Sequence, residues 1–164
     1  MSLATALRRP SAAGAATSSG RPVLLVTLGV PLDARAAVFA VDSAVEAGRE
    51  LVVVNVTTLE PLRLSMVMGY DALPELTPEV SASLEGSARL ARSLGVRVER
   101  LRIRSPRPVE ALVELAGERH PGVLVFGPDP GGLAPRRYRR ALRALLQRAG
   151  CLVWVPPDVF TSMS

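Results

Sequence analysis

Residues that could bind an anion are concentrated in one stretch, from residue 123 to residue 155. The turn after the apolar run 123–126 begins at Gly127, and its possible N–H donors are Asp129, Gly131, Gly132 and the start of the following helix. Such a turn before a helix can aim several N–H groups at a phosphate, and the helix dipole adds to the attraction. The helix then begins with four arginines, namely Arg136, Arg137, Arg139 and Arg140. We take this turn and the start of this helix as the candidate ligand site.

Two prolines argue against a standard phosphate site here, because Pro128 and Pro130 have no N–H to donate. The arginines, in contrast, crowd the amino end of the helix, where the dipole disfavours cations, and they make a strongly positive spot that a solvated face does not fully explain. Two interpretations stay open: a solvated helix face, or a site for an anion such as phosphate, a nucleotide or an acidic protein surface. Nucleic acid is not expected, because the exposed side of the helix carries no aromatic residues for stacking.

The residues that most often perform catalysis have simpler explanations in this sequence. His120 is the only histidine and falls in a helix-to-strand turn, where it is expected to be exposed or to cap the helix. Cys151 begins an apolar run and is expected in the core. Asp33 and Asp42 are explained by helix capping and solvation. We find no catalytic triad, carboxylate pair or metal-ligand spacing, so the sequence predicts no catalytic residue and no metal site.

Length and composition indicate one domain. The chain has 164 residues, of which 48% are hydrophobic and 4% aromatic, so the core should be aliphatic. We expect a disordered leader at 1–21, the domain at 22–158 and a tail at 159–164. The net charge is +5, and every basic side chain other than His120 is arginine, which permits acidic partners without demonstrating one. A single cysteine fits a cytoplasmic protein, and no apolar run is long enough to span a membrane.

Apolar runs and capping residues predict five strands and four helices. The strands are expected at 23–28, 51–56, 96–104, 123–126 and 151–155. The helices should begin after Asp33, Thr77, Pro106 and Ala134. The first helix is expected to bury five residues, namely Ala37, Val38, Val41, Ala44 and Val45. Residues 57–76 form a long loop that packs on the sheet or a partner chain, or acts as a lid.

The alternation of strands and helices predicts an α/β fold. We expect an open, parallel, five-stranded sheet of the flavodoxin-like or Rossmann-like type, with helices on both faces. Strand 96–104 alternates apolar with charged residues, whereas the other strands are apolar throughout. Alternation of this kind is typical of a strand with one wet face, so this strand should lie outermost.

Several segments together resemble the universal stress proteins. They are LLVTLG, VVVNV, VRVERLRIRSPRPVEALVELAGERHPGVLVFG, GGL and CLVWVPP, and they extend over about residues 23–156. The resemblance implies a flavodoxin-like five-stranded sheet. It also implies a homodimer that uses the last strand, from Cys151 to Val155.

Members of this family that bind ATP or AMP carry an acidic residue after the first strand and a glycine signature after the fourth. In this chain the acidic position is Leu28, followed by a matching Gly29, and Val56 stands where the adenine pocket would be lined. The signature begins at Gly127, but the next glycine is one residue out of register. Depending on the alignment, its closing glycine and serine are replaced by Arg139 and Arg140 or by Ala141 and Leu142.

The sequence therefore favours a universal stress protein-like regulatory or binding domain that is not catalytic and lacks standard ATP binding. One alternative is an ATP-binding or AMP-binding protein in which the arginines replace the lost phosphate contacts. Another is a dimeric interaction module without a small ligand, which uses the last strand and the loop around Met66, Met68 and Tyr70.

Overall fold

The computed structural model describes residues 20–59 and 76–157. Most of the predicted leader and of the predicted loop 57–76, and the whole of the predicted tail, lie outside the described residues. The described strands are β1 (Val23–Thr27), β2 (Leu51–Thr58), β3 (Val98–Ser105), β4 (Val123–Phe126) and β5 (Leu152–Trp154). The described helices are α1 (Ala34–Ala47), α3 (Pro78–Ser93), α4 (Pro108–Arg119) and α5 (Pro135–Arg148). No helix within these ranges is long and apolar enough to cross a membrane.

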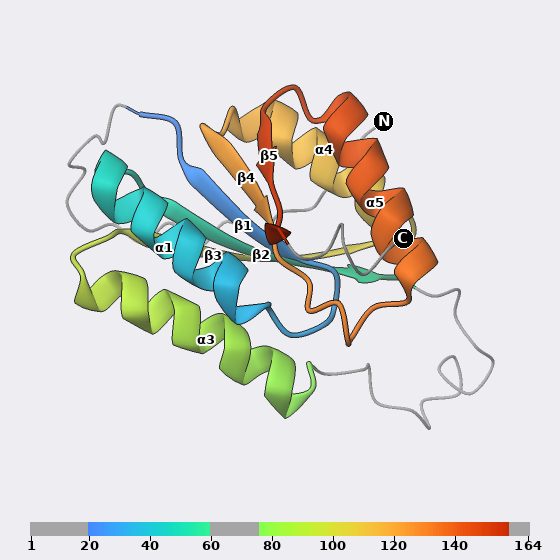
Figure 1. The fold of residues 1–164 in the computed structure, drawn as a ribbon, viewed down its shortest axis with the longest axis horizontal. Coiled ribbons are helices and arrows are strands. Elements are labelled where there is room, and N and C mark those ends of the chain that lie inside the picture. The colour runs from blue at the N-terminus through green and yellow to red at the C-terminus, as the bar shows by residue number, and fades with distance from the viewer. Residues whose placement is uncertain (1–19, 60–75, 158–164) are drawn as a thin grey trace.

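The strands form one parallel sheet in the order β3-β2-β1-β4-β5. Helices α1 and α3 cover one face of the sheet, and α4 and α5 cover the other (Figure 1). The predicted α/β fold class is confirmed. From β1 the chain first adds β2 and β3 on one side, and it then adds β4 and β5 on the other side of β1. Ligand sites in such sheets commonly lie at this switch point, here between the neighbouring strands β1 and β4.

The central strands are mainly apolar because both of their faces are covered, with Thr27 and Asn55 as buried polar exceptions. In β2, Val52, Val54 and Val56 pack toward α4 and α5, whereas Leu51 and Val53 pack toward α1 and α3. Each of these five side chains is buried. Two apolar cores of this kind require apolar residues at successive positions, which explains the unbroken runs in the sequence.

The two edge strands differ in character. Strand β3 lies outermost, as its alternation predicted, and alternates between half-buried and exposed residues from Glu99 to Ser105. The prediction of a buried last strand at 151–155 was wrong. Strand β5 is shorter, forms the other edge of the sheet and leaves the Leu152 side chain 68% exposed. Cys151 precedes the strand and is half-buried rather than in the core. The physical reason is that an edge strand lacks a neighbour on one side.

The predicted start of α1 after Asp33 is confirmed, and its predicted buried face was right at Val41 and Ala44 but wrong at Val38 and Val45. The Asp33 side chain accepts a hydrogen bond from the Arg35 backbone N–H, and Gly48 ends the helix with a left-handed φ of 61°. The face toward the sheet consists of Ala36, Ala40, Val41 and Ala44. Val38 and Val45 are 51% and 41% exposed instead. Small alanines let the helix lie close to the sheet, so the helix is rotated from the orientation that its valines suggested.

Candidate functional site

The first half of the turn after β4 uses its backbone N–H groups within the protein. The N–H of Gly127 donates to the Val26 carbonyl at 2.9 Å, and the N–H of Asp129 donates to the Pro31 carbonyl at 2.8 Å. Pro128 has no N–H. The turn is thereby joined to the end of β1 and to the segment that follows β1.

The second half of the turn folds back on Asp129. The N–H of Gly131 donates to Oδ1 of Asp129 at 3.2 Å, and the N–H of Gly132 donates to the Asp129 carbonyl at 2.9 Å. Pro130 again offers no donor. Every N–H that residues 127–132 possess is therefore bonded inside the protein. A phosphate would have to displace these bonds.

Two glycines of this turn allow close packing. A Cβ on Gly127 would lie 2.9 Å from the Ala36 Cβ, and a Cβ on Gly132 would lie 3.0 Å from the Val30 Cβ. The Gly127 carbonyl also accepts a hydrogen bond of 2.8 Å from the Asp33 N–H. These glycines thus bring the turn against the β1–α1 connection, which explains them without a ligand.

The positions expected to contact a nucleoside are filled with apolar side chains. Leu28 is 2% exposed and Val56 is fully buried, and both belong to the same apolar cluster as Tyr138 and Leu133. Gly29 has a left-handed φ of 74° and donates its N–H to Oδ1 of Asn55 at 2.8 Å. Asn55 was not among the residues predicted from the sequence, although an asparagine within the apolar run 51–56 was a signal.

The four arginines at the start of α5 lie outside the apolar cluster that contains Leu28 and Val56. Arg136, Arg137, Arg139 and Arg140 are all exposed, and no side chain caps the helix. Arg137 Nη2 donates to Oγ1 of Thr58 at the end of β2, at 3.0 Å. Arg139 Nε donates to the Pro135 carbonyl at 3.4 Å. The structure thus brings Arg137 to the end of β2, whereas no hydrogen bond or ion pair joins the four guanidinium groups to the turn 127–132 within the described residues.

The residues considered for catalysis occupy structural positions. His120 is exposed and ends α4 with a φ of 47°. Burial raises the pKa of the Cys151 thiol, which disfavours the reactive thiolate. Burial also acts to raise the pKa of Asp33, but hydrogen bonds and charge from Arg35 outweigh it and hold this pKa below its usual value. Within the described ranges, no group of three or more histidine, cysteine or acidic side chains could hold a metal ion.

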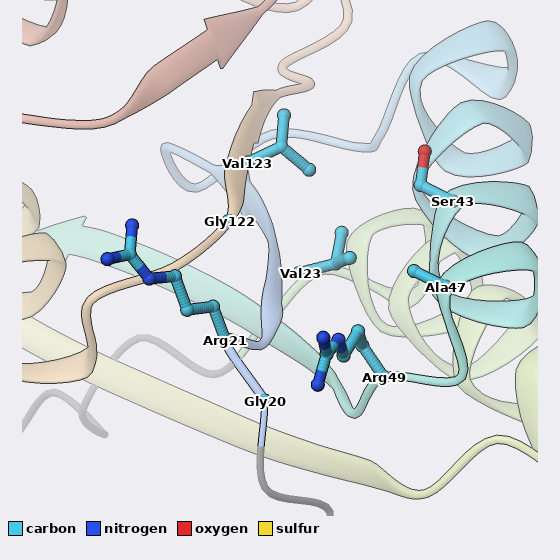
Figure 2. Close-up of a pocket in the computed structure, with 8 residues that line it drawn as sticks. All are labelled: Gly20, Arg21, Val23, Ser43, Ala47, Arg49, Gly122 and Val123. Carbon is cyan, nitrogen blue, oxygen red and sulfur yellow. The ribbon is translucent and has the colours of Figure 1, made fainter.

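A surface pocket lies at the opposite end of the sheet, where the strands begin (Figure 2). Its volume is about 490 Å³, and its lining combines two arginines with Ser43, glycines and small apolar residues, namely Gly20, Arg21, Val23, Ala47, Arg49, Gly122 and Val123. The Arg49 guanidinium fills the space beside Gly20, because a Cβ there would lie 1.1 Å from Arg49 Nη1. None of the residues predicted to bind a ligand lines this pocket.

Solved structures with the same fold include universal stress proteins. One is from Burkholderia pseudomallei, with 19% identity over 84% of this chain and 96% of the other and a TM-score of 0.58. A second was solved in complex with cAMP, with 20% identity over 83% and 96% of the two chains and a TM-score of 0.56. A third, from Archaeoglobus fulgidus, was solved in complex with dAMP, with 17% identity over 83% and 97% and a TM-score of 0.55.

These identities are low enough that the likeness shows the fold alone. No curated protein sequence matches the chain significantly. A sequence model of the universal stress protein family, however, matches residues 20–157, which is most of the chain. With the sheet order and the strand and helix sequence described above, this match shows that the chain belongs to the universal stress protein family.

Proposed function

We propose that this chain is a non-catalytic binding domain that acts through protein association and does not bind ATP or AMP in the standard mode. The observation that carries this proposal is the hydrogen bonding of the turn after β4. Each N–H of residues 127–132 already has an acceptor within the protein. A phosphate site needs several N–H groups that are free and aimed at one point.

The apolar filling of the nucleoside region supports the same proposal. Leu28 stands at the position of an acidic residue in nucleotide-binding relatives, and it is 2% exposed within the apolar cluster. A ribose hydroxyl at this position would lose its hydrogen bonds to water and gain none from leucine. The relatives solved with cAMP and dAMP show what those proteins bind; in this chain the region proposed to correspond is an apolar cluster that includes Leu28 and Val56.

We also propose that two copies associate through β5. The opposite edge strand, β3, presents the exposed Arg100, Arg102 and Arg104, and such charges protect an edge from pairing. Strand β5 carries no charge and exposes Leu152. Its Trp154 stacks on Phe39 of α1, with ring centroids 4.0 Å apart and an interplanar angle of 4°, which fixes the strand. We also propose a cytoplasmic location, because the chain has a single cysteine and thus no disulfide of its own.

The alternative function is nucleotide binding through the arginines. The observation that favours it is the start of α5, where no side chain caps the helix and four guanidinium groups are exposed. Guanidinium groups pair with phosphate through two parallel hydrogen bonds. In this alternative, the arginines would replace the N–H donors that the turn lacks.

Mass spectrometry of the purified protein, first under native and then under denaturing conditions, tests the proposal. We expect no nucleotide to be released, and no change in Tm when ATP, AMP or cAMP is added with Mg²⁺. Release of a nucleotide on denaturation would contradict the proposal. So would a nucleotide-dependent rise in Tm that Arg136→Ala or Arg140→Ala abolishes while Arg89→Ala, on α3, retains it.

A further inference from the structure

Six exposed arginines gather where α4 and α5 begin. We call them the arginine surface, and they are Arg107, Arg136, Arg137, Arg139, Arg140 and Arg143. Arg107 is the N-cap of α4, and the other five belong to the first three turns of α5. Helices α4 and α5 lie side by side on the same face of the sheet (Figure 1).

Hydrogen bonds and strand pairing bring the starts of α4 and α5 to the same end of the sheet, where β2 and β3 finish. Arg137 Nη2 donates to Thr58 Oγ1 at 3.0 Å. Thr58 pairs with Ser105 in the β2–β3 ladder. The Ser105 Oγ in turn accepts a hydrogen bond of 3.1 Å from the Arg107 N–H. Arg107 and Arg137 are thus connected through two residues that face each other across neighbouring strands.

The guanidinium groups of the arginine surface are not engaged in ion pairs in the described part of the chain. The first turn of α5 has no acidic residue. The carboxylate closest in sequence to Arg107 is Glu110, which is held by Arg148 through two hydrogen bonds of 2.6 and 2.8 Å. Cations at the start of a helix oppose its dipole, so these arginines do not serve helix stability.

The positive area is bounded by acidic residues. Glu114 and Glu118 are exposed and follow Glu110 at intervals of four residues, so the three lie along one side of α4. Glu110 belongs to the first turn of α4, and its pKa is lowered mainly by its hydrogen bond to Arg148 and also by the charge of Arg107. Helix α5, in contrast, contains no acidic residue, so its five arginines are the part of the arginine surface where an acidic segment would bind.

We infer that the arginine surface docks an acidic segment of a partner protein. Guanidinium groups bind carboxylates through paired, charge-assisted hydrogen bonds, and several of them in a row fit a run of Asp and Glu side chains. This inference names the partner class for the protein association proposed above and rests on that proposal. It does not require the pairing of two copies through β5.

Nucleic acid fits the same surface less well. The one aromatic side chain among the arginines, Tyr138, is 2% exposed and is not available for stacking with a base.

Fluorescence anisotropy with a labelled oligo-glutamate peptide tests the inference, with a labelled Gly-Ser peptide as the neutral control. We expect saturable binding at low salt that weakens as salt is added. Arg140→Glu should weaken binding about tenfold or more, as should Arg136→Glu. Arg89→Glu makes the same charge change on α3, where Arg89 is exposed, and should change the affinity less than about twofold.

Three results would overturn the inference: no binding of oligo-glutamate at low salt, an equal loss in Arg89→Glu, or tighter binding of a DNA duplex with the same sensitivity to Arg140→Glu. Circular dichroism of each variant establishes that it is folded. Nucleotide is tested separately by its effect on Tm. A nucleotide-dependent rise contradicts the proposed function, whereas failure of peptide binding without such a rise contradicts this inference alone.

Discussion

The backbone N–H of Gly29 donates a hydrogen bond of 2.8 Å to Oδ1 of Asn55. This bond joins the turn after β1 to a side chain near the end of β2, two neighbouring strands of the sheet. Gly29 has a φ of 74°, which an L side chain adopts at a cost, and Asn55 is 1% exposed. The amide nitrogen Nδ2 of Asn55 has no hydrogen-bond partner within the described residues. Asn55 thus serves the turn through its oxygen alone.

Removing the Asn55 oxygen should destabilise the fold. Asn55→Ala leaves the N–H of the half-buried Gly29 without its acceptor, so the free energy of unfolding should fall by about 1–3 kcal/mol. Urea denaturation measures the loss. Asn55→Asp keeps an acceptor but buries a charge, and its destabilisation should be smaller near pH 4 than near pH 7, as the carboxyl group gains its proton. A wild-type stability for Asn55→Ala would contradict this role.

Gly127 and Gly117 offer a matched pair of glycine substitutions. A Cβ on Gly127 would lie 2.9 Å from the Ala36 Cβ, so Gly127→Ala should reduce the free energy of unfolding by about 1–3 kcal/mol. Gly117 lies in α4, and a Cβ at this position would point into open space. Gly117→Ala should therefore raise the stability by about 0.5–1 kcal/mol. Equal effects in thermal unfolding would show that Gly127 does not serve close packing.

The hydroxyl of Tyr138 is buried without a hydrogen-bond partner in the part of the chain described. Burial raises the pKa of this group to about 12. Tyr138→Phe keeps the ring contact with Phe126, whose centroid lies 5.0 Å away, and removes the unpaired oxygen. The stability should stay the same or rise by up to about 1 kcal/mol. A clear loss of stability in urea denaturation would mean that the hydroxyl has a partner in solution.

Association through β5 should depend on its exposed leucine. Leu152→Arg places a charge on the edge strand and should shift the protein from dimer to monomer in sedimentation velocity. Leu90→Arg makes the same change on α3, where Leu90 is 46% exposed, and should leave the dimer intact. Monomeric wild-type protein, or dissociation by both substitutions, would contradict an interface at β5.

Several features of this protein follow from local sequence. Unbroken apolar runs located the central strands because both of their faces are covered. The alternation from Glu99 to Arg104 placed β3 at an edge, and Asp33, Thr77 and Gly48 marked helix ends through their local backbone contacts. Tyr138, Leu142 and Leu145 recur at helical spacing in the sequence, and they lie on the buried side of α5. Each of these signals depends on residues within a few positions of one another.

Other features were decided only by the tertiary structure. The N–H groups of Gly127 and Asp129 find their acceptors at Val26 and Pro31, far away in the sequence. The same holds for Arg137, which reaches Thr58. Helix α1 is rotated so that Val38 is exposed, and β5 has an open edge. Local periodicity shows that a segment has an apolar side. Which residues pack against that side, and which acceptor each backbone N–H reaches, depends on how segments distant in the sequence are placed together.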